Sequence, residues 1–393
     1  MGLRTLTAGE SHGPGLVAIL EGMPAGLPLD ERIIDDQLAR RQSGYGAGPR
    51  MKLERDHAQI LSGVMEGSTT GAPIAILIEN MDHAKWRGKA IEALTTPRPG
   101  HVDLAGVIKY GYSDIRPALE RSSARETAAR VAAGAVCRHL LTQFGIEIGG
   151  YVLSIGSIAA EADEFSYPER FARAEKSEVR CADEQASEKM RSLIREIMQA
   201  KDTLGGVIEI VALGLPPGLG SHVQFDRRLE AKIGAAVLSV QAIKGVEFGP
   251  AFENTRLPGT QVHDAIRLDA GKLIRPTNRA GGIEGGISTG QALVVRAAMK
   301  PIATTLTPQQ TVDLATGTEE DTRYERSDFC PVPRAVPVLE AVLAYVLADA
   351  LLEKLGGDSI PEMRPRFEQL RQATLKDAAM KNDPHIFWPD GEE

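Results

Sequence analysis

Short apolar runs separated by polar and glycine-rich stretches dominate the pattern of this chain. Four of them, at residues 15–21, 72–80, 205–214 and 291–298, have the length and boundaries of β-strands. Apolar runs of this kind are typical of strands buried within a sheet, and residues 15–21 in particular are expected to form a buried strand. Amphipathic segments lie between the runs, so the pattern predicts a chain that alternates between strands and helices.

Helix-start and helix-stop signals place three helices between these strands and a fourth after the last strand. Most begin at a residue whose side chain can accept a hydrogen bond from the first turn, and glycines mark several of the ends. The expected helices are about 30–42, capped by Asp30; 123–145, opened by a Ser-x-x-Glu capping box at Ser123 and Glu126; 226–243, capped by Asp226; and 334–355, ended by Gly356.

Two stretches of the chain, residues 17–41 and 207–233, resemble each other weakly. Both run from a strand through Gly-x-Pro-x-Gly-Leu into a helix opened by aspartate, and the glycine–proline pair makes a tight exit from the strand. We infer two similar half-units, with chance similarity of two strand–turn–helix units as the alternative. The expected organisation is one domain, 1–375, with half-units at about 10–150 and 200–340, followed by a polar tail, 376–393.

The composition is that of an ordinary globular protein, with 393 residues, 42% hydrophobic and 25% charged. A net charge of −8 gives no basic footprint for nucleic acid, and no window reaches the roughly 18 consecutive apolar residues of a membrane helix. The first residues lack the apolar core of a signal peptide. Cys137, Cys181 and Cys330 form no Cys-x-x-Cys pair, which favours the reducing cytoplasm. The sequence contains no recognisable metal-ligand spacing, so no metal site is expected.

Arginines gather beside glycines in several segments of this acidic chain. The groups are Arg40, Arg41 and Arg50; Arg98; Arg116, Arg121, Arg125 and Arg130; Arg275 and Arg279; and Arg323 and Arg326. Guanidinium forks bind phosphate and carboxylate groups, so the clustering predicts a small polyanionic ligand. Any one of these arginines, taken singly, is better explained as solvated surface charge.

Two histidines stand next to glycines in short loops. His12 lies in Gly-Glu-Ser-His-Gly, and His101 lies in Arg-Pro-Gly-His. Imidazole titrates near neutral pH, so a histidine aimed inward from such a loop can act as an acid or a base. A loop histidine is more often a surface residue, which remains the alternative for each motif alone.

Four further segments carry candidate chemistry. Arg121 and Arg125 crowd the positive start of the helix that Ser123 is expected to cap, a mismatch that an anion would relieve. Residues 277–288 hold four glycines within six positions, although not in the Gly-x-Gly-x-x-Gly arrangement of a dinucleotide-binding fold. The last two are Lys-Pro-Ile-Ala-Thr at 300–304 and Arg-Ser-Asp ending at Asp328, where the alternative for the aspartate is a simple ion pair.

Together these segments resemble the chorismate synthase family over nearly the whole chain. The matching stretches are GESHGPGLVAILEGMPAG, RRQSGYGAGPRM, TPRPGHVDLAG, LERSSARETAARVAAGA, DTLGGVIEIVALGLPPGLGS, VQAIKGVEFG, TNRAGGIEGGISTGQ, AMKPIATT and RSDFCPVPRA. The resemblance implies an α+β fold, a β-α-β sandwich. It also implies the 1,4-anti elimination of phosphate from 5-enolpyruvylshikimate-3-phosphate to give chorismate, the last step of the shikimate pathway. Reduced FMN as cofactor, NADPH as a candidate reductant and a homotetramer follow from the same resemblance.

The resemblance also implies roles for particular residues. His12 corresponds to the histidine that protonates the departing phosphate, His101 to the one that protonates the flavin, and Asp328 to the base that works through flavin N5 on the C6 proton. The matched substrate-binding positions are Ser11, Arg41, Arg50 and Arg125. The matched flavin-binding positions are Arg121, Ser122, Ser123, Gln241, Ala242, Gly285, Gly286, Lys300, Pro301, Ile302, Ala303, Thr304 and Arg326.

One position departs from the pattern of some relatives. Ala47 stands where they have an arginine associated with NADPH, so the resemblance leaves a built-in flavin reductase activity open. Two other functions stay open as well. A flavin oxidoreductase would consume NADPH without substrate, and a non-catalytic anion-binding module would bind phosphate esters without turnover.

Overall fold

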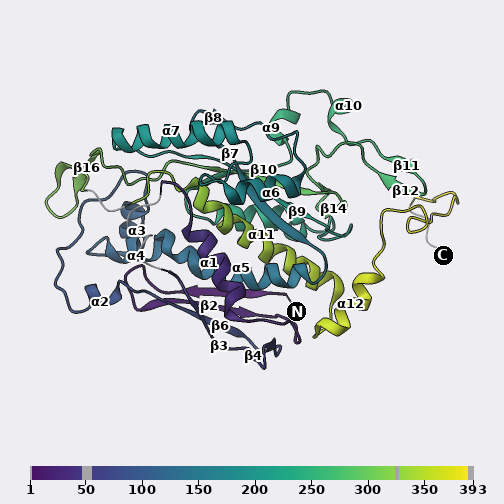
Figure 1. Ribbon diagram of the computed structural model, residues 1–393, viewed down its shortest axis with the longest axis horizontal. Coiled ribbons are helices and arrows are strands. Elements are labelled where there is room, and N and C mark those ends of the chain that lie inside the picture. The colour runs from purple at the N-terminus through teal and green to yellow at the C-terminus, as the bar shows by residue number, and fades with distance from the viewer. Residues whose placement is uncertain (1, 47–54, 324–326, 388–393) are drawn as a thin grey trace, which may run out of the picture.

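The computed structural model describes residues 2–46, 55–323 and 327–387, so Ala47, Arg50 and Arg326 lie outside the described residues. Two antiparallel sheets dominate it (Figure 1). The first has the order β1-β2-β6-β3, with strands Arg4–Ala8, Gly15–Glu21, Ile74–Glu79 and Ala58–Ser62. The second has the order β10-β15-β9-β7-β8, with strands Ile243–Phe248, Leu293–Met299, Gly206–Leu213, Glu147–Ile155 and Ile158–Ala159.

A layer of helices separates the two sheets, as Figure 1 shows. Its members are α1 (Glu31–Gln42), α5 (Thr127–Thr142), α8 (Leu229–Leu238) and α11 (Val332–Leu355). Helix α5 contacts β2 and β6 on one side, whereas α11 contacts β7 and β9 on the other, and α5 and α11 pack against each other. Their apolar side chains form one continuous core. The layers are those of a β-α-β sandwich, which the resemblance implied.

The outer layer and the connections complete the chain. Helix α6 (Tyr167–Lys176) covers the far face of the five-stranded sheet, where Phe171 packs against Tyr151, and α7 (Glu184–Ala200) lies nearby. The other helices are α2 (His83–Trp86), α3 (Asp103–Tyr110), α4 (Arg116–Ser122), α9 (Ala251–Asn254), α10 (Gly259–Val262) and α12 (Ile360–Glu368). The short strands are β4 (Val64–Met65), β5 (Ser68–Thr69), β11 (Arg267–Asp269), β12 (Lys272–Ile274), β13 (Ile283–Glu284), β14 (Ile287–Ser288), β16 (Gln310–Asp313) and β17 (Thr318–Asp321).

Strand β2 differs from the expectation of a buried strand. Leu16, Ala18 and Leu20 are buried against the helix layer, but Ile19 on the opposite face is 39% exposed. The alternation follows from the period of two in a strand, because only one face of this sheet is covered within the chain. An unbroken apolar run therefore does not prove burial on both faces.

Two of the predicted helix starts are wrong. Ser123 Oγ accepts from the backbone N–H of Arg125 rather than that of Glu126, and the Glu126 carboxylate faces Thr7 and Arg130, so no capping box forms. Asp226 lies in a separate 3-10 turn, and α8 begins only at Leu229, whose N–H donates to the Gly286 carbonyl. In both places a contact with a distant segment overrides the local signal. The cap at Asp30 is confirmed, since its side chain accepts from the N–H of Ile33.

Helix α11 is long and apolar enough to cross a membrane by length and composition alone. Its sequence did not predict this, because charged residues interrupt its apolar run. However, 89% of its most apolar stretch is buried inside the protein, and its buried residues extend from Val332 to Leu355. A helix that is apolar on all sides is also what the centre of a large core requires. Within the described residues α11 is therefore the central core helix.

The two segments of the weak repeat form β2–α1 and β9–α8. Each is a central strand of its sheet followed by a turn and a helix of the middle layer. Only the first helix begins at its aspartate, as described above. An origin by duplication, and the division into half-units, stay predictions.

The crossing of α5 and α11 depends on Gly134. A Cβ at this position would lie 2.5 Å from the Cβ of Ala341 and 2.7 Å from its carbonyl oxygen. We expect Gly134→Ala to lower the free energy of unfolding by about 1–3 kcal/mol, because the helices would have to separate. Gly234→Ala is the matched control, since a Cβ in α8 would meet no atom within 4 Å. Higher helix propensity should make that variant more stable by up to about 1 kcal/mol. Thermal unfolding of both variants tests this prediction. Equal changes in the stability of the two variants would contradict it.

Candidate active site

His12 lies in the turn between β1 and β2, where contacts from two other segments hold it. Gly9 opens this turn with φ +110°, and a Cβ there would lie 2.3 Å from the Gly15 carbonyl oxygen. Glu120 of α4 accepts from the backbone N–H of His12 at 2.7 Å, and its other oxygen lies 2.7 Å from His12 Nδ1. The ring centroids of His12 and Trp86 are 4.8 Å apart. The histidine is thus held by both its ring and its backbone.

The pKa of Glu120 shows which group in this pair is the anion. Burial raises the pKa of this carboxyl, but hydrogen bonds from the ring and backbone of His12 outweigh burial and hold it below the ordinary value of 4.5. Glu120 is therefore a carboxylate at neutral pH, which accepts hydrogen bonds and donates none.

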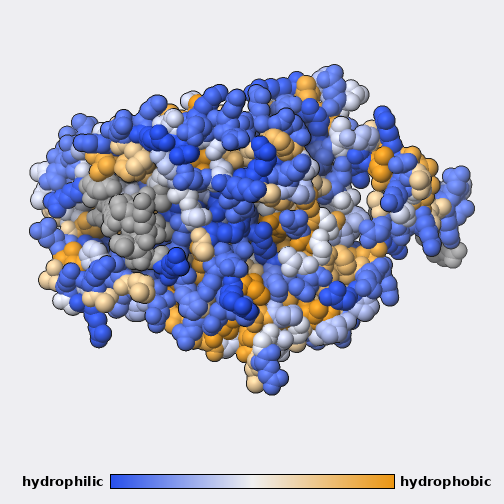
Figure 2. Space-filling view, viewed as in Figure 1, coloured by the Kyte–Doolittle hydropathy of each residue, from blue (hydrophilic) through white to orange (hydrophobic). Residues whose placement is uncertain are grey.

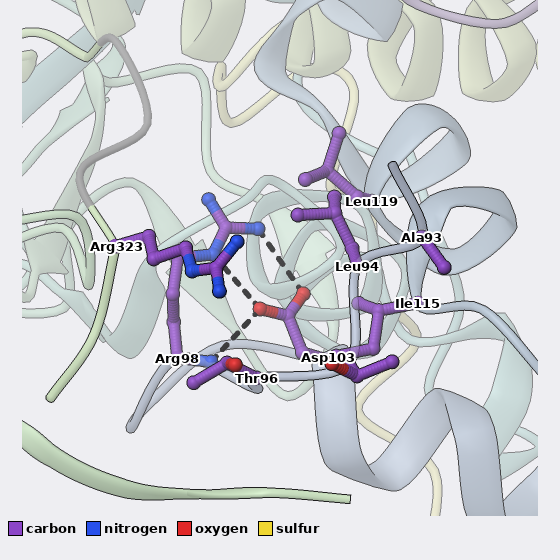
Figure 3. Close-up of a pocket in the computed structure, with 9 residues that line it drawn as sticks. Ala93, Leu94, Thr96, Arg98, Asp103, Ile115, Leu119 and Arg323 are labelled. Atoms are coloured by element: carbon purple, nitrogen blue, oxygen red, sulfur yellow. Dashed lines mark hydrogen bonds and ion pairs between the residues drawn. The ribbon is translucent and has the colours of Figure 1, made fainter. Parts of the chain in front are cut away.

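His101 is held in a similar way at the start of α3. Its Nδ1 is hydrogen-bonded to Asp103 Oδ1, and Arg98 Nη2 lies 3.0 Å from the same nitrogen. Arg98 Nε donates to Asp103 Oδ2 at 2.8 Å. Burial raises the pKa of Asp103, but the bonds from His101 and Arg98 outweigh it and hold the pKa far below 3.8. In Figure 3 Arg98 and Asp103 point toward one another beside a pocket that Leu94, Ile115 and Leu119 also line.

The segment after β15 connects the His101 loop to the centre of the molecule. Lys300 Nζ donates to the Gly100 carbonyl at 2.9 Å, and Arg98 Nη1 donates to Thr304 Oγ1 at 3.0 Å. The backbone N–H of Lys300 donates to the Ala242 carbonyl at 3.0 Å. The structure therefore brings together His101, Ala242 and the 300–304 segment, which lie far apart in the sequence.

Arg41 and Arg125 share one carboxylate. Arg41 Nη2 lies 2.6 Å from Asp56 Oδ2, and Arg125 Nη1 lies 2.5 Å from Asp56 Oδ1. Burial raises the pKa of Asp56, but the two arginines outweigh it and hold the pKa below 3.8. Burial, with repulsion from Arg334 and Arg125, lowers the pKa of Arg41 to about 10, so Arg41 remains a cation at neutral pH.

The arginine pair is tied to the His12 turn through Asn80, the residue after β6. Arg125 Nε donates to Asn80 Oδ1 at 2.8 Å. Asn80 Nδ2 donates to the carbonyls of Glu10 and Gly13, at 3.0 and 2.9 Å. Both sides of the histidine turn are therefore fixed to the same amide. A predicted acid and a predicted anion-binding arginine thus belong to one hydrogen-bonded unit.

Asp328 joins this unit from the other side. Arg334, in the first turn of α11, donates through Nη1 to Asp328 Oδ2 and through Nε to the Arg41 carbonyl at 3.3 Å. Among the described residues, the group of Arg41, Arg125 and Arg334 with Asp56 and Asp328 carries one more positive than negative charge. That imbalance favours an anionic ligand, as the clustering of arginines in the sequence predicted.

Arg121 and Arg125 do not crowd one helix end, contrary to the sequence prediction. Arg121 turns toward β1, where it donates to Thr7 and Gly9 carbonyls, and lies 3.8 Å from Glu126. Arg125 turns toward Asp56. Each cation lies near a carboxylate, Glu126 for Arg121 and Asp56 for Arg125, so the inferred mismatch at the helix start does not exist and does not by itself indicate a phosphate.

The serines and Gln241 lie between the two histidine loops. Ser123 Oγ donates to Ser11 Oγ at 3.2 Å, and Ser122 Oγ donates back to the Leu119 carbonyl. Gln241 Nε2 donates to Glu126 Oε2 at 3.4 Å, while its buried Oε1 has no hydrogen-bond partner among the described residues. A buried acceptor of this kind suits a ligand that can donate.

Gly285 and Gly286 lie apart from this group. They form the tip of the β13–β14 hairpin, and Ile287 bridges to Gly220, beyond the Leu213 end of β9. Lys300 follows the opposite end of β15, because Met299 pairs with Gly206 and Leu293 with Ala212. Six residues of strand separate the two ends by about 20 Å. Within one chain the structure does not bring these glycines to the other predicted flavin positions.

Sequence reasoning missed the residues that hold the site together. Asp56 and Asn80 are single polar residues outside the matching stretches, whereas Glu120 and Arg334 lie inside two of them without a predicted role, and only the contacts reveal what these four residues hold. Asp103 left a weak signal, since it stands two positions after His101.

The fold and this geometry define a class, a β-α-β sandwich in which arginines gather around buried carboxylates and two loop histidines are each paired with a carboxylate. The sequence model of the chorismate synthase family matches residues 3–352. Chorismate synthase of Trichlorobacter lovleyi is 54% identical over 92% of this chain and 97% of its own length, and that of Aquifex aeolicus is 52% identical over 93% and 96%. A crystal structure of chorismate synthase is 46% identical, with a TM-score of 0.77 over 94% of this chain and 97% of that one.

The chain therefore belongs to the chorismate synthase family. This confirms the family, the α+β sandwich and the enzyme class expected from the sequence. The activity is that of a carbon–oxygen lyase that forms chorismate in aromatic amino acid biosynthesis. Members of the family require a reduced flavin.

Asp56 offers a direct test of the arginine pair. Its side chain is 2% exposed, so Asp56→Asn leaves two arginines without their charged partner and should lower the free energy of unfolding by about 3–5 kcal/mol at neutral pH. Because the pKa of Asp56 is lowered by folding, the stability it contributes is present above its ordinary pKa of 3.8 and lost as the pH falls through the folded value. The difference between parent and variant should therefore shrink in acid.

Urea unfolding across about pH 3 to 8 measures this difference. Asp30→Asn is the control, because Asp30 pairs with the exposed Arg32 and asparagine serves equally well as a helix cap. Its stability should stay close to that of the parent at every pH. A difference for Asp56→Asn that is independent of pH would contradict the ionised role of Asp56.

Proposed function

We propose that the cluster between the His12 turn, the His101 loop and the Arg41–Asp56–Arg125 unit is the site where this chain eliminates phosphate from 5-enolpyruvylshikimate-3-phosphate. The observation that carries the proposal is the chain of hydrogen bonds from the His12 turn through Asn80, Arg125, Asp56, Arg41 and Arg334 to Asp328. This chain links a candidate acid, a candidate base and candidate anion-binding arginines, which supports the proposal. This substrate carries two carboxylates and a phosphate, which need such cations.

The residues of this wall suit the steps of the elimination. We assign the binding of anionic groups to Ser11, Arg41 and Arg125. Breaking the C3–O bond leaves its electron pair on the departing phosphate, and His12 gives that phosphate a proton. The C6–H bond breaks as well, and we assign that proton to Asp328, held by Arg334. Positioned acids and bases typically contribute about 10²–10⁴-fold each. Arg50, outside the described residues, stays a proposed contact of the substrate.

We assign the reduced FMN to the neighbouring part of the site. Arg121, Ser122, Ser123, Gln241 and Ala242 would hold it together with Lys300, Pro301, Ile302, Ala303 and Thr304, while Arg326 lies outside the described residues. The buried Gln241 Oε1, which lacks a partner among the described residues, fits a ligand with N–H groups. When bound, the reduced flavin supplies the electron-rich surface that assists C–O cleavage. His101, fixed by Asp103 and Arg98, is placed to exchange a proton with it.

The assembly and the cellular location complete the proposal. The outer face of the four-stranded sheet exposes Leu6 (66%) and Leu61 (54%), and Figure 2 shows apolar surface along this edge of the molecule. An uncovered apolar sheet face supports a homo-oligomer, for which we propose the tetramer that the resemblance implies. Three buried, unpaired cysteines support a cytoplasmic enzyme.

Phosphate release tests the reaction itself. Anaerobic incubation with 5-enolpyruvylshikimate-3-phosphate should release phosphate with reduced FMN and none with oxidised FMN. A further arm with oxidised FMN and NADPH asks whether the chain reduces its own flavin, the question that Ala47 raises. Release that is independent of reduced flavin would contradict the cofactor, and steady NADPH oxidation without substrate would favour an oxidoreductase.

Three variants test the division of roles. His12→Ala, His101→Ala and Asp328→Ala should each keep the melting temperature and most FMN affinity while turnover falls by about 10²-fold or more. His57→Ala is the control, since its side chain is 69% exposed and, although it follows Asp56 in the chain, pairs with Asp35 rather than with a predicted site residue. Substrate deuterated at C6 should show a larger isotope effect in Asp328→Ala, because proton removal becomes more limiting. Near-parental turnover of the Asp328 variant would remove it as the base.

A further inference from the structure

Glu120 is joined to the His12 turn by three hydrogen bonds. Its two side-chain oxygens take the backbone N–H and the ring Nδ1 of His12, and its own carbonyl accepts from the N–H of Ser11 at 3.3 Å. The side chain is only 12% exposed. One residue of α4 therefore fixes the position of the turn and the orientation of the imidazole together.

The chemistry of the pair decides which nitrogen of His12 carries its proton. An ionised carboxylate can only accept hydrogen bonds, so Nδ1 must donate to Glu120 in both the neutral and the protonated ring. The proton on Nδ1 thus stays between His12 and Glu120. Exchange of a proton with a ligand falls to Nε2.

Two other described neighbours of His12 contact its backbone and its ring. His83 Nδ1 lies 3.0 Å from the His12 carbonyl, so it engages the backbone, and Trp86 packs against the ring. The positive charge of Arg116, on the first turn of α4, lowers the pKa of Glu120 and so favours its ionised form.

We propose that Glu120 is a positioning residue for the elimination, which holds His12 as the Nδ1–H tautomer so that Nε2 delivers its proton to the departing phosphate. In the step the Nε2–H bond breaks, a phosphate O–H bond forms, and the ring becomes the neutral Nδ1–H imidazole. The carboxylate stabilises the imidazolium before the transfer and orients the ring afterwards. The proposal rests on the acid role of His12 given above and adds the residue that enables it.

The chain contains a similar pair among residues with no predicted role. One oxygen of Asp35 on α1 lies 2.5 Å from His57 Nδ1, and the other accepts from the N–H of Ala58 at 2.8 Å. The backbone N–H is that of the residue after the histidine rather than of the histidine itself, and the His57 side chain is 69% exposed. Removing this carboxylate therefore controls for the loss of a histidine–carboxylate pair as such.

The test compares Glu120→Gln, the control Asp35→Asn and His12→Ala with the parent. Glutamine keeps the shape of the glutamate side chain but has only one acceptor oxygen. It therefore cannot accept from both the backbone N–H and the Nδ1–H of His12 in the same geometry. We expect turnover of Glu120→Gln to fall by about 10²-fold, with KM and FMN affinity within about twofold of the parent. Asp35→Asn should retain parental turnover.

Nitrogen-15 chemical shifts of labelled histidine, measured by solid-state NMR, report the tautomer directly. The chain has eight histidines, and the spectrum of His12→Ala identifies the His12 signals by difference. At a pH high enough to deprotonate the ring, the remaining proton of His12 should lie on Nδ1 in the parent, whereas Glu120→Gln should shift the population toward Nε2–H. A merely structural role would change the melting temperature without changing the tautomer.

The outcomes separate this inference from the proposed function. If His12→Ala keeps parental turnover, the acid role of His12 fails and the inference fails with it. If His12→Ala is impaired but Glu120→Gln is not, only the role of Glu120 is overturned. An Nε2–H tautomer in the parent overturns it too, and this measurement needs no variant of Glu120 to fold.

Discussion

The buried carboxylate of Asp56 between Arg41 and Arg125 is the interaction on which the rest of the site depends. It joins the end of α1 to the start of α5 and, through Arg125 and Asn80, holds the His12 turn in place. Two guanidinium groups this deeply buried would repel each other without an anion between them. The same pairing leaves both arginines oriented and charged, so the elements that build the core also prepare the site for an anionic substrate.

The same kind of pairing occurs at each residue proposed to transfer a proton. His12 is paired with Glu120, His101 with Asp103, and Asp328 with Arg334, and in each case a side chain that can carry the opposite charge fixes the proposed group. Long or rotatable side chains lose less freedom during the reaction when they are held beforehand. For the histidines, the carboxylate also determines which ring nitrogen stays protonated, which orientation alone would not achieve.

The fold was largely predictable because its signals are local. The strands at β2, β6, β9 and β15, the cap at Asp30 and the long apolar helix α11 each follow from periodicity within a few residues. The errors occurred at Ser123 and Asp226, where local capping signals compete with distant partners. Thr7 and Arg130 take the carboxylate of Glu126, and the Gly286 carbonyl fixes the start of α8.

The sequence by itself determined the family, because residue types and short motifs carry that signal, and it indicated His12, His101 and Asp328 as candidates for the chemistry. Tertiary structure alone decided which charges meet. Asp56, Glu120 and Asn80 lie 15 to 108 positions from their partners, and no periodicity connects them. It also separated Gly286 from Lys300 at opposite ends of β15. The energy of an ion pair depends on the distance between its two charges in space. That distance is set by how the sheets and helices pack and not by the separation of the residues along the chain.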